Sequence, residues 1–282
     1  MKTRFIAEIS SNHNQDIART LSLIDEAKRV GCWAVKFQLF KAELLYHKSF
    51  KAQIEKMKKW ELPESFLPII RRRCDKLGLK FICTPFDLEA VETLIPFVDY
   101  FKVGSYELLW DDLIKAIIKT GKLWMLSTGM DGVDKIRGKK WKGKKINPCY
   151  AILHCNSNYP AKPENCNLDQ ITKNQAWFHF QKHGWSDHTV EPGIIYKAIS
   201  LGAEFIEFHF DLESMLGFES SVGHCWPPRK IKQVIDNVRI GEMAEVSKNT
   251  AEQEASKWRT DPIDGLRPLR EYRKELGEKN II

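Results

Sequence analysis

The sequence predicts a single (β/α)8 barrel followed by a short tail, and three observations lead to this prediction. Short apolar runs recur eight times, amphipathic segments separate them, and polar side chains gather where the apolar runs end. The length of 282 residues suits one barrel, which typically needs about 250 residues. Hydrophobic residues make up 43% and charged residues 29% of the chain, a composition typical of a folded domain. We expect the barrel in residues 1–246 and the tail in residues 247–282.

The apolar runs are nearly continuous, as is usual for strands of a parallel sheet that are buried on both faces. We expect strands at residues 4–10, 34–40, 80–86, 100–105, 123–129, 150–156, 183–188 and 204–210. An open, doubly wound sheet is the alternative. It is disfavoured because no glycine-rich fingerprint follows the first run and because such a sheet normally needs only about six strands.

The segments between the runs carry apolar residues at helical spacing. We expect helices at residues 17–31, 64–78, 88–95, 109–121, 190–202 and 229–246. Gly31 and Gly78 stand at the ends of two of these segments, where glycine is a common helix C-cap. The repeated order of helix, glycine, short polar step and apolar run indicates successive βαβ units.

Composition and charge indicate which kinds of molecule the protein can bind. The net charge is +7, but the basic residues are spread along the chain, and the one dense run, at residues 137–145, comes without a recognised nucleic-acid-binding module. We therefore expect no nucleic-acid partner, and the positive field suits small anionic substrates. No apolar run approaches the ~20 residues of a membrane span, and the N-terminus does not resemble a signal peptide. We expect a cytoplasmic protein whose seven cysteines form no disulfide framework.

In a (β/α)8 barrel the chemistry takes place at the C-terminal ends of the strands. The polar residues that the predicted strands bring to this rim include Glu8, Lys36, Gln38, Thr84, Lys102, Ser105, Glu107, Ser127, Asn156, Tyr159, His188, Glu207 and His209. Any one of them has an ordinary structural explanation, such as a lysine that extends to the solvent. Their convergence at one rim favours a site, because buried lysines are costly unless anions pair with them.

The residue types indicate the chemistry of this site. Lys36 and Lys102, with the hydroxyl groups of Thr84, Ser105 and Ser127, can surround a phosphate and a carboxylate. His188 and His209 come from neighbouring predicted strands and can bind one divalent cation. With oxygen atoms as the other ligands, Mn²⁺, or else Mg²⁺ or Co²⁺, fits better than a closed structural zinc site. A serine hydrolase is excluded because the chain has no GxSxG elbow.

Eight ordered motifs between about residue 4 and about residue 228 extend this interpretation. They are FIAEISSNHNQD, AVKFQLF, CTPFD, FKVGSYE, LSTGM, LHCNSNYP, SDHT and IEFHF. In this order the sequence resembles the N-acetylneuraminate (sialic acid) synthase family, which includes pseudaminic and legionaminic acid synthases. The resemblance implies a barrel that condenses phosphoenolpyruvate with an N-acylated aldose, releases phosphate and works as a homodimer.

The same resemblance implies a role for each rim residue. The metal falls to His188 and His209, where it polarises the aldehyde while Glu107 assists proton transfer. The phosphoenolpyruvate contacts fall on Lys36, Thr84, Lys102, Ser105, Ser127 and Asn156. The sugar contacts fall on Glu8, Gln38, Glu107 and Tyr159.

The chain departs from the family pattern in three places. Ser157 stands where the family has Asn, as in the pseudaminic branch, which weakens the case for sialic acid itself. Residues 212–228 replace a GPD stretch, with Glu219 near the position of its Asp. In the family, a C-terminal antifreeze-like domain supplies a sugar-binding arginine. We expect this chain to lack such a domain and its tail to place Arg267 near a barrel mouth instead. The alternatives are a deoxy-octulosonate-type condensation and an inactive barrel that serves as a binding protein.

Overall fold

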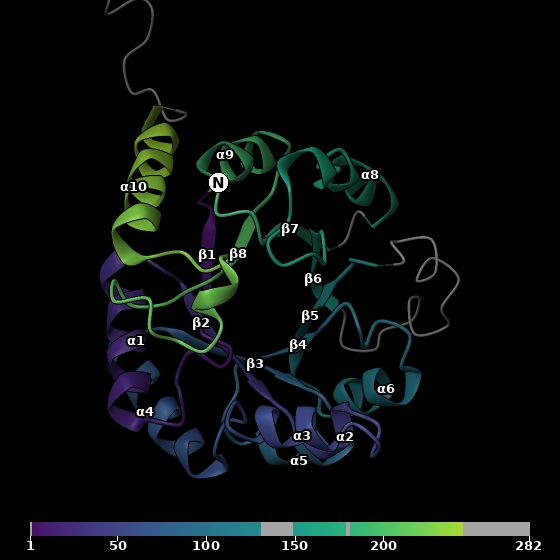
Figure 1. Ribbon diagram of the computed structural model, residues 1–282. Coiled ribbons are helices and arrows are strands. Elements are labelled where there is room, and N and C mark those ends of the chain that lie inside the picture. Colours follow the sequence, from purple (N-terminus) through teal and green to yellow (C-terminus); the bar gives the residue numbers. More distant parts are fainter. Residues whose placement is uncertain (1, 131–148, 179–180, 245–282) are drawn as a thin grey trace, which may run out of the picture. The chain divides into compact units, whose positions relative to one another are not determined.

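The computed structural model describes residues 2–130, 149–178 and 181–244. Eight parallel strands form one closed barrel in the order of the chain, which confirms the predicted (β/α)8 fold (Figure 1). The strands are β1 (Arg4–Glu8), β2 (Ala34–Leu39), β3 (Lys80–Pro85), β4 (Tyr100–Val103), β5 (Leu123–Ser127), β6 (Cys149–Cys155), β7 (Lys182–Asp187) and β8 (Phe205–His209). Each strand coincides with a predicted run, although each ends one or two residues earlier than predicted.

Helices cover the outside of the barrel (Figure 1). They are α1 (Ile17–Val30), α2 (Ala42–Leu45), α3 (Lys51–Lys58), α4 (Leu67–Leu77), α5 (Leu88–Leu94), α6 (Asp111–Lys119), α8 (Gln170–Trp177), α9 (Pro192–Ser200) and α10 (Pro228–Ala244). Short 3-10 turns are η1 (Glu64–Phe66), η3 (Pro163–Asn165) and η4 (Ser220–Val222). All six predicted helices are present within the described residues, whereas α2, α3 and α8 were not predicted. None of the described helices is long and apolar enough to cross a membrane.

Helix α1 shows how local sequence sets these boundaries. The Asp16 side chain accepts hydrogen bonds from the backbone N–H groups of Ala18 and Arg19 and so caps the first turn. Gly31 ends the helix in the left-handed conformation, with φ of 98°. Between these ends, buried residues including Leu23 and Ile24 pack against the barrel wall.

The N-terminal end of the barrel is closed by apolar and aromatic side chains. Its interior layer consists of Ile6, Ala34, Ile82, Met125, Ala151, Leu153 and Phe205. Below this layer, the Arg4 guanidinium lies over the rings of Trp33 and Phe205, at 5.2 and 5.4 Å from their centroids, and donates a hydrogen bond to the Tyr150 hydroxyl. Because this end is filled, ligands can reach the interior only from the C-terminal ends of the strands.

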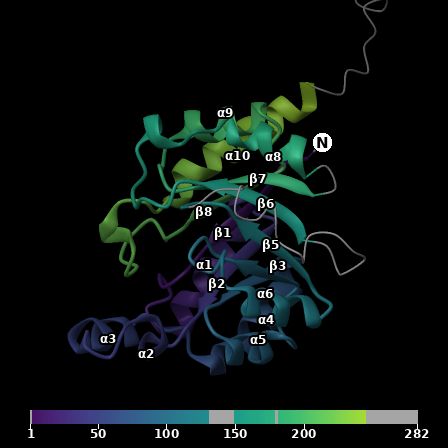
Figure 2. The same cartoon turned by 90° about the vertical axis from the view of Figure 1, so that its right-hand side faces the viewer.

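Two segments stand at that open end. The α2–α3 segment follows β2, and the β8–α10 loop (residues 210–227) follows β8 (Figure 2). The rings of Trp60 and Phe218, one from each side, stack at a centroid distance of 5.7 Å with an interplanar angle of 5°. The stack joins the two segments across the rim. The chain divides into two compact units, Met1–Val238 and Arg239–Ile282, and the site described below lies in the first.

Candidate active site at the barrel mouth

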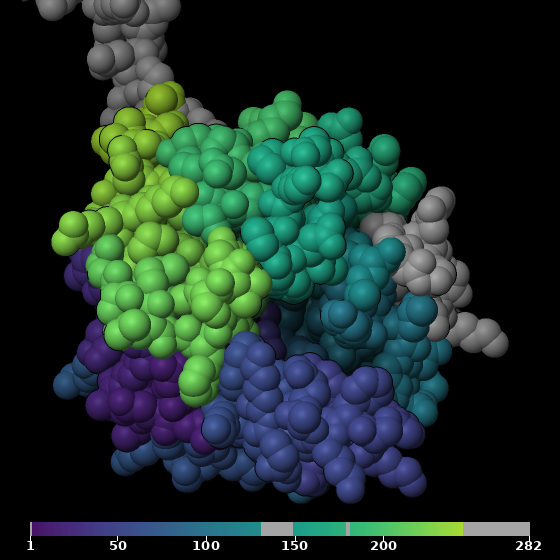
Figure 3. Space-filling model, in the orientation of Figure 1, coloured from purple at the N-terminus to yellow at the C-terminus, as the bar shows by residue number. Residues whose placement is uncertain are grey.

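A small cavity of about 80 Å³ forms the floor of the barrel mouth, beneath the hollow seen in Figure 3. The residues of the predicted site that line it are Lys36, Gln38, Thr84, Lys102, Ser105, Glu107, Ser127, Tyr159, His188 and His209. Glu8 lies beneath them in the same network, fully buried. Asn156 lines a wider neighbouring pocket, and Arg267 falls outside the described residues. The structure therefore brings together almost the whole predicted set.

Strand register explains this convergence. Glu8 on β1 lies opposite Lys36 on β2 and opposite His209 on β8, so one carboxylate stands between the two strands. Gln38 pairs in the same way with Thr84 on β3. Because side chains alternate along a strand, residues two apart, such as Lys36 and Gln38, point to the same side.

Two lysines and two glutamates form the charged floor. The Lys36 ammonium contacts the Glu8 carboxylate and lies 3.2 Å from Glu207 Oε1. Burial disfavours this ammonium, but Glu207 and Glu8 outweigh burial and raise the pKa of Lys36 above its usual range. Glu207 also accepts a hydrogen bond from Ser186, at 3.1 Å. Lys36 is thus held charged by two carboxylates, those of Glu8 and Glu207.

The positive charge of Lys102 is neutralised less completely than that of Lys36. Its ammonium lies 3.7 Å from Glu207 Oε1 and donates a hydrogen bond to the Ser127 hydroxyl. Burial lowers the pKa of Lys102, and Glu207 only partly offsets this effect. A lysine that shares its counter-ion with Lys36 is the part of the floor that an incoming anion would stabilise most.

Hydroxyl groups and a glycine surround this lysine. Thr84 Oγ1 is buried without a hydrogen-bond partner among the described residues, so it is free to donate to a ligand. The Ser105 hydroxyl accepts a hydrogen bond from the N–H group of Gly129, at 3.1 Å. A Cβ atom at Gly129 would lie 2.2 Å from Ser157 Oγ and 2.8 Å from Ser105 Oγ, so any larger residue there would displace these hydroxyl groups. These groups form a neutral, donor-rich wall beside the lysines.

Glu107 stands at the edge of the floor with a perturbed carboxyl group. It is 8% exposed, and its Oε2 atom has no hydrogen-bond partner among the described residues. Burial raises the pKa of Glu107 to about 7. A carboxyl group with this pKa can both accept and donate a proton near neutral pH.

His188 and His209 lie at the other side of the cavity, with ring centroids 5.4 Å apart. Nδ1 of His188 is 2.6 Å from the carbonyl oxygen of Asn156, and Nδ1 of His209 is 2.8 Å from Glu219 Oε2. Each histidine thus hydrogen-bonds through Nδ1, which leaves Nε2 available as a metal ligand. Burial, together with the nearby His209, lowers the pKa of His188 to about 3, so its ring is neutral as a metal ligand must be. The pair fits a divalent cation.

The sequence of this chain is also similar to those of known proteins. Residues 23–250 match the model of the NeuB family. The chain belongs to the NeuB family.

Individual relatives agree with this assignment. An uncharacterized protein of Methanocaldococcus jannaschii is 36% identical over 249 residues, which cover 85% of this chain and 71% of the relative. The N,N'-diacetyllegionaminic acid synthase of Campylobacter jejuni is 31% identical, over 84% of this chain and 76% of that protein. The crystal structure of a sialic acid synthetase from Leptospira borgpetersenii, in complex with citrate, superposes with a TM-score of 0.81 at 25% identity and covers 99% of this chain and 94% of its own.

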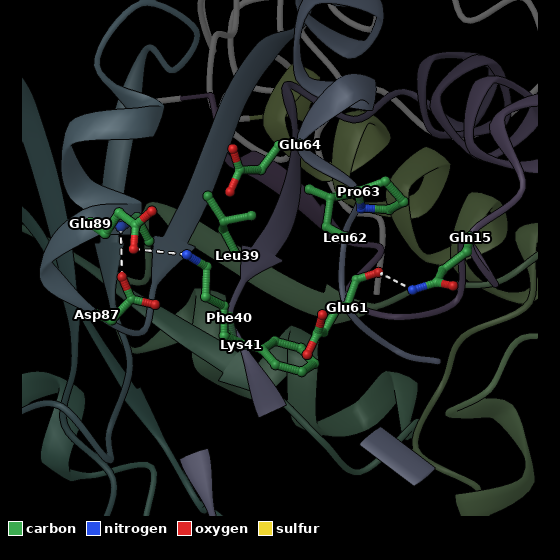
Figure 4. Close-up of a pocket in the computed structure, with 11 residues that line it drawn as sticks. Gln15, Leu39, Phe40, Lys41, Glu61, Leu62, Pro63, Glu64, Asp87 and Glu89 are labelled. Atoms are coloured by element: carbon green, nitrogen blue, oxygen red, sulfur yellow. Dashed lines mark hydrogen bonds and ion pairs between the residues drawn. The ribbon is translucent and has the colours of Figure 1, made fainter. Parts of the chain in front are cut away.

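Two further pockets of this NeuB-family barrel flank the floor. A wide pocket of about 550 Å³ beside β6 is lined in part by side-chain amides, which are those of Asn156, Asn158, Asn165, Asn167 and Gln170. A pocket of about 270 Å³ between Gln15, the end of β2 and the start of α5 carries Lys41 and four carboxylates (Figure 4). In that pocket Lys41 pairs with Glu89 at 2.8 Å, Asp87 caps α5, and Glu61 accepts a hydrogen bond from Ala42 N–H. Because these carboxylates hold neighbouring segments, we assign them no chemistry.

Several residues of this environment have no role predicted from the sequence. Glu207 was recognised at the rim but not assigned, although its position two residues before His209 on β8 places it on the same side of the strand. Glu219, His224 and Cys225 come from the β8–α10 loop and lie beside His209. No periodicity could place them, because loop residues follow no repeating pattern. The only signal was the departure of residues 212–228 from the family pattern.

Proposed function

We propose that this protein condenses phosphoenolpyruvate with an N-acylated aldose of the hexosamine type, giving a nonulosonic acid and inorganic phosphate. The observation that carries the proposal is the single cavity that holds Lys36 and Lys102 on one side and the His188–His209 pair on the other. The lysines can bind a substrate with two or three negative charges, and a cation at the histidine pair can polarise an aldehyde. The proposed reaction requires both groups in one cavity. Membership of the NeuB family, whose relatives include legionaminic and sialic acid synthases, supports the same reaction.

Phosphoenolpyruvate would bind at the lysine side. Lys102 lacks a counter-ion of its own, so a phosphate or carboxylate oxygen supplies the missing charge. The free Thr84 hydroxyl and the Ser105 and Ser127 hydroxyl groups surround the same space and can donate to the remaining oxygen atoms. Glu8 and Glu207 keep Lys36 charged and fix its position.

The chemistry joins carbon 3 of phosphoenolpyruvate to the aldehyde carbon of the sugar, while water adds at carbon 2 and phosphate leaves. A divalent cation at His188 and His209, which we expect to be Mn²⁺, would act as a Lewis acid when bound. Glu107, with its pKa near 7, is suited to take a proton from the attacking water and to return it to a leaving oxygen. The buried floor excludes bulk water from these charged groups.

The sugar would occupy the outer part of the mouth. The Tyr159 ring lies 4.2 Å from the His188 ring and is 45% exposed, so it offers an aromatic face beside the metal ligands. The amide-rich pocket next to it suits hydroxyl and acylamino substituents. Gln38, whose side chain donates to Glu8 at 3.3 Å, completes this side.

Phosphate release from phosphoenolpyruvate, measured with Mn²⁺ and a panel of aldoses, tests the proposal. Turnover with N-acylated hexosamines supports it. Turnover restricted to arabinose- or erythrose-type phosphosugars indicates the deoxy-octulosonate-type reaction instead, and no turnover with any aldose indicates a binding protein.

A further inference from the structure

Four potential metal ligands gather at the end of β8, beside Nδ1 of His209. One ligand atom from each of His209, Glu219, His224 and Cys225 lies within 4.8 Å of the other three. Two of the separations are shorter, because Glu219 Oε2 is 2.8 Å from His209 Nδ1 and 3.7 Å from His224 Nε2. Ligand atoms of a tetrahedral zinc site lie about 3.3–3.8 Å apart, given zinc–nitrogen and zinc–sulfur bonds of about 2.0–2.3 Å. To reach that geometry, the 2.8 Å separation must widen and the longest separations must shorten, each by about 1 Å or less.

The local backbone brings these residues to one point. Gly223, in the left-handed conformation with φ of 92°, turns the chain back toward β8 after η4. Trp226 N–H then donates to the His209 carbonyl at 2.8 Å, which fixes the adjacent residues along the end of the strand. His224 and Cys225 are therefore held beside His209 by main-chain contacts and do not depend on a ligand for their position.

The surroundings are those of a metal site rather than of solvent-exposed polar groups. His209, His224 and Cys225 are buried, and the Glu219 side chain is 12% exposed. The Asn12 amide points a donor at Cys225 Sγ from 3.4 Å, an outer contact that stabilises a thiolate.

We propose that Glu219, His224 and Cys225, with Nδ1 of His209, form a second cation site for a borderline-soft ion of the zinc type. A thiolate, two imidazoles and a carboxylate are donors that Zn²⁺ prefers, whereas Mn²⁺ and Mg²⁺ prefer oxygen. On binding, Cys225 releases its proton to solvent, so the thiolate and the Glu219 carboxylate neutralise the two charges of the ion in a buried place.

The site has a consequence for His209. A neutral imidazole binds a metal through one nitrogen while it keeps its proton on the other. Zinc at Nδ1 replaces the hydrogen bond from His209 to Glu219, and Nε2 then carries the proton. The second site therefore competes with a cation at His188 and His209, and zinc acts as an inhibitor of the barrel.

Titration of the full chain with Co²⁺, followed by absorption spectroscopy under reducing conditions, tests the site. A thiolate-to-cobalt charge-transfer band is expected in the wild-type protein and in His188→Ala, because His188 is not part of the site. The band should disappear in Cys225→Ser and persist in the matched control Cys74→Ser, whose thiol is buried in α4. A wild-type protein without the band, or a band that survives Cys225→Ser, overturns the proposal.

A second variant covers the case that Cys225→Ser does not fold. Zn²⁺ affinity, measured by competition with a chromophoric chelator, should fall by at least about 100-fold in His224→Ala, because loss of an outer partner alone typically costs 10–100-fold. Unchanged affinity contradicts the assignment. Neither measurement requires phosphoenolpyruvate or turnover, so both results are independent of the proposed condensation.

Discussion

Nδ1 of His209 lies 2.8 Å from Oε2 of Glu219, at the end of β8. Burial opposes protonation of this histidine, but Glu219 outweighs burial and raises the pKa of His209. The contact fixes the orientation of the ring and directs Nε2 away from Glu219, which is the arrangement of a carboxylate–histidine–metal unit.

A metal pair follows from this orientation and from the matching contact of His188. We expect His188→Ala and His209→Ala each to abolish Mn²⁺-dependent turnover and to weaken Mn²⁺ binding, with melting temperatures close to that of the wild type. Calorimetric titration with Mn²⁺ measures the binding. Full activity in the double variant contradicts the assignment.

The lysines of the floor should determine affinity for phosphoenolpyruvate. A charge-assisted hydrogen bond contributes about 1.5–3 kcal/mol, so Lys36→Ala and Lys102→Ala should each weaken binding by about tenfold or more. Lys41→Ala, which removes an exposed lysine of the neighbouring acidic pocket, is the control and should leave the affinity unchanged. Calorimetry that finds wild-type affinity in both single variants removes these lysines from the site.

Glu107 makes stability depend on pH. Its pKa is raised from 4.5 to about 7 in the folded chain, so between these values the folded state binds more protons than the unfolded state. Stability should therefore fall as pH rises from about 4.5 to about 7 and then level off, with a total loss of at most about 3 kcal/mol. Glu107→Gln should lack this loss, which makes it more stable than the wild type at pH 8 but not at pH 4.5. Denaturant unfolding at the two pH values measures the difference, and equal curves at pH 8 contradict it.

Gly129 should be intolerant of a side chain. A Cβ atom there would meet Ser157 Oγ at 2.2 Å and both Cys155 Sγ and Ser105 Oγ at 2.8 Å, so Gly129→Ala must displace the wall beside the lysines. We expect a rise of at least about tenfold in the KM for phosphoenolpyruvate, partly restored by the additional change Ser157→Ala. Gly193→Ala, where a Cβ atom meets nothing within 4 Å, serves as the control. Unaltered kinetics in Gly129→Ala would show that this wall is remote from the substrate.

The fold was predictable because its signals are local and periodic. Each predicted strand contains an observed strand nearly in full, since continuous apolar runs mark strands buried on both faces. Helices α3 and α8 escaped prediction because each carries only one or two buried residues and has no clear apolar face. The tail, including Arg267, lies outside the described residues, so its proposed place at a barrel mouth stays a prediction. The homodimer and the cytoplasmic location also stay predictions.

The positions of the candidate-site residues that lie on strands could be predicted from the sequence. Residues such as Lys36, Lys102 and His209 sit on strands whose ends must converge in a closed barrel. Distances within the floor could not be foreseen, and so the sharing of Glu207 between two lysines appears only in the structure. The cluster around His224 was equally hidden, because it depends on how an irregular loop folds back on β8.

The stoichiometry of phosphate release tests the proposed condensation most directly. The purified protein would be mixed with phosphoenolpyruvate, Mn²⁺ and one N-acylated hexosamine at a time. The amount of phosphate released would be compared with the amount of nonulosonic acid formed. We predict a one-to-one ratio with at least one of these sugars, lost on removal of the metal and in Lys102→Ala. Phosphate released without a new carbon–carbon bond, or no release with any N-acylated aldose, would contradict the proposed condensation.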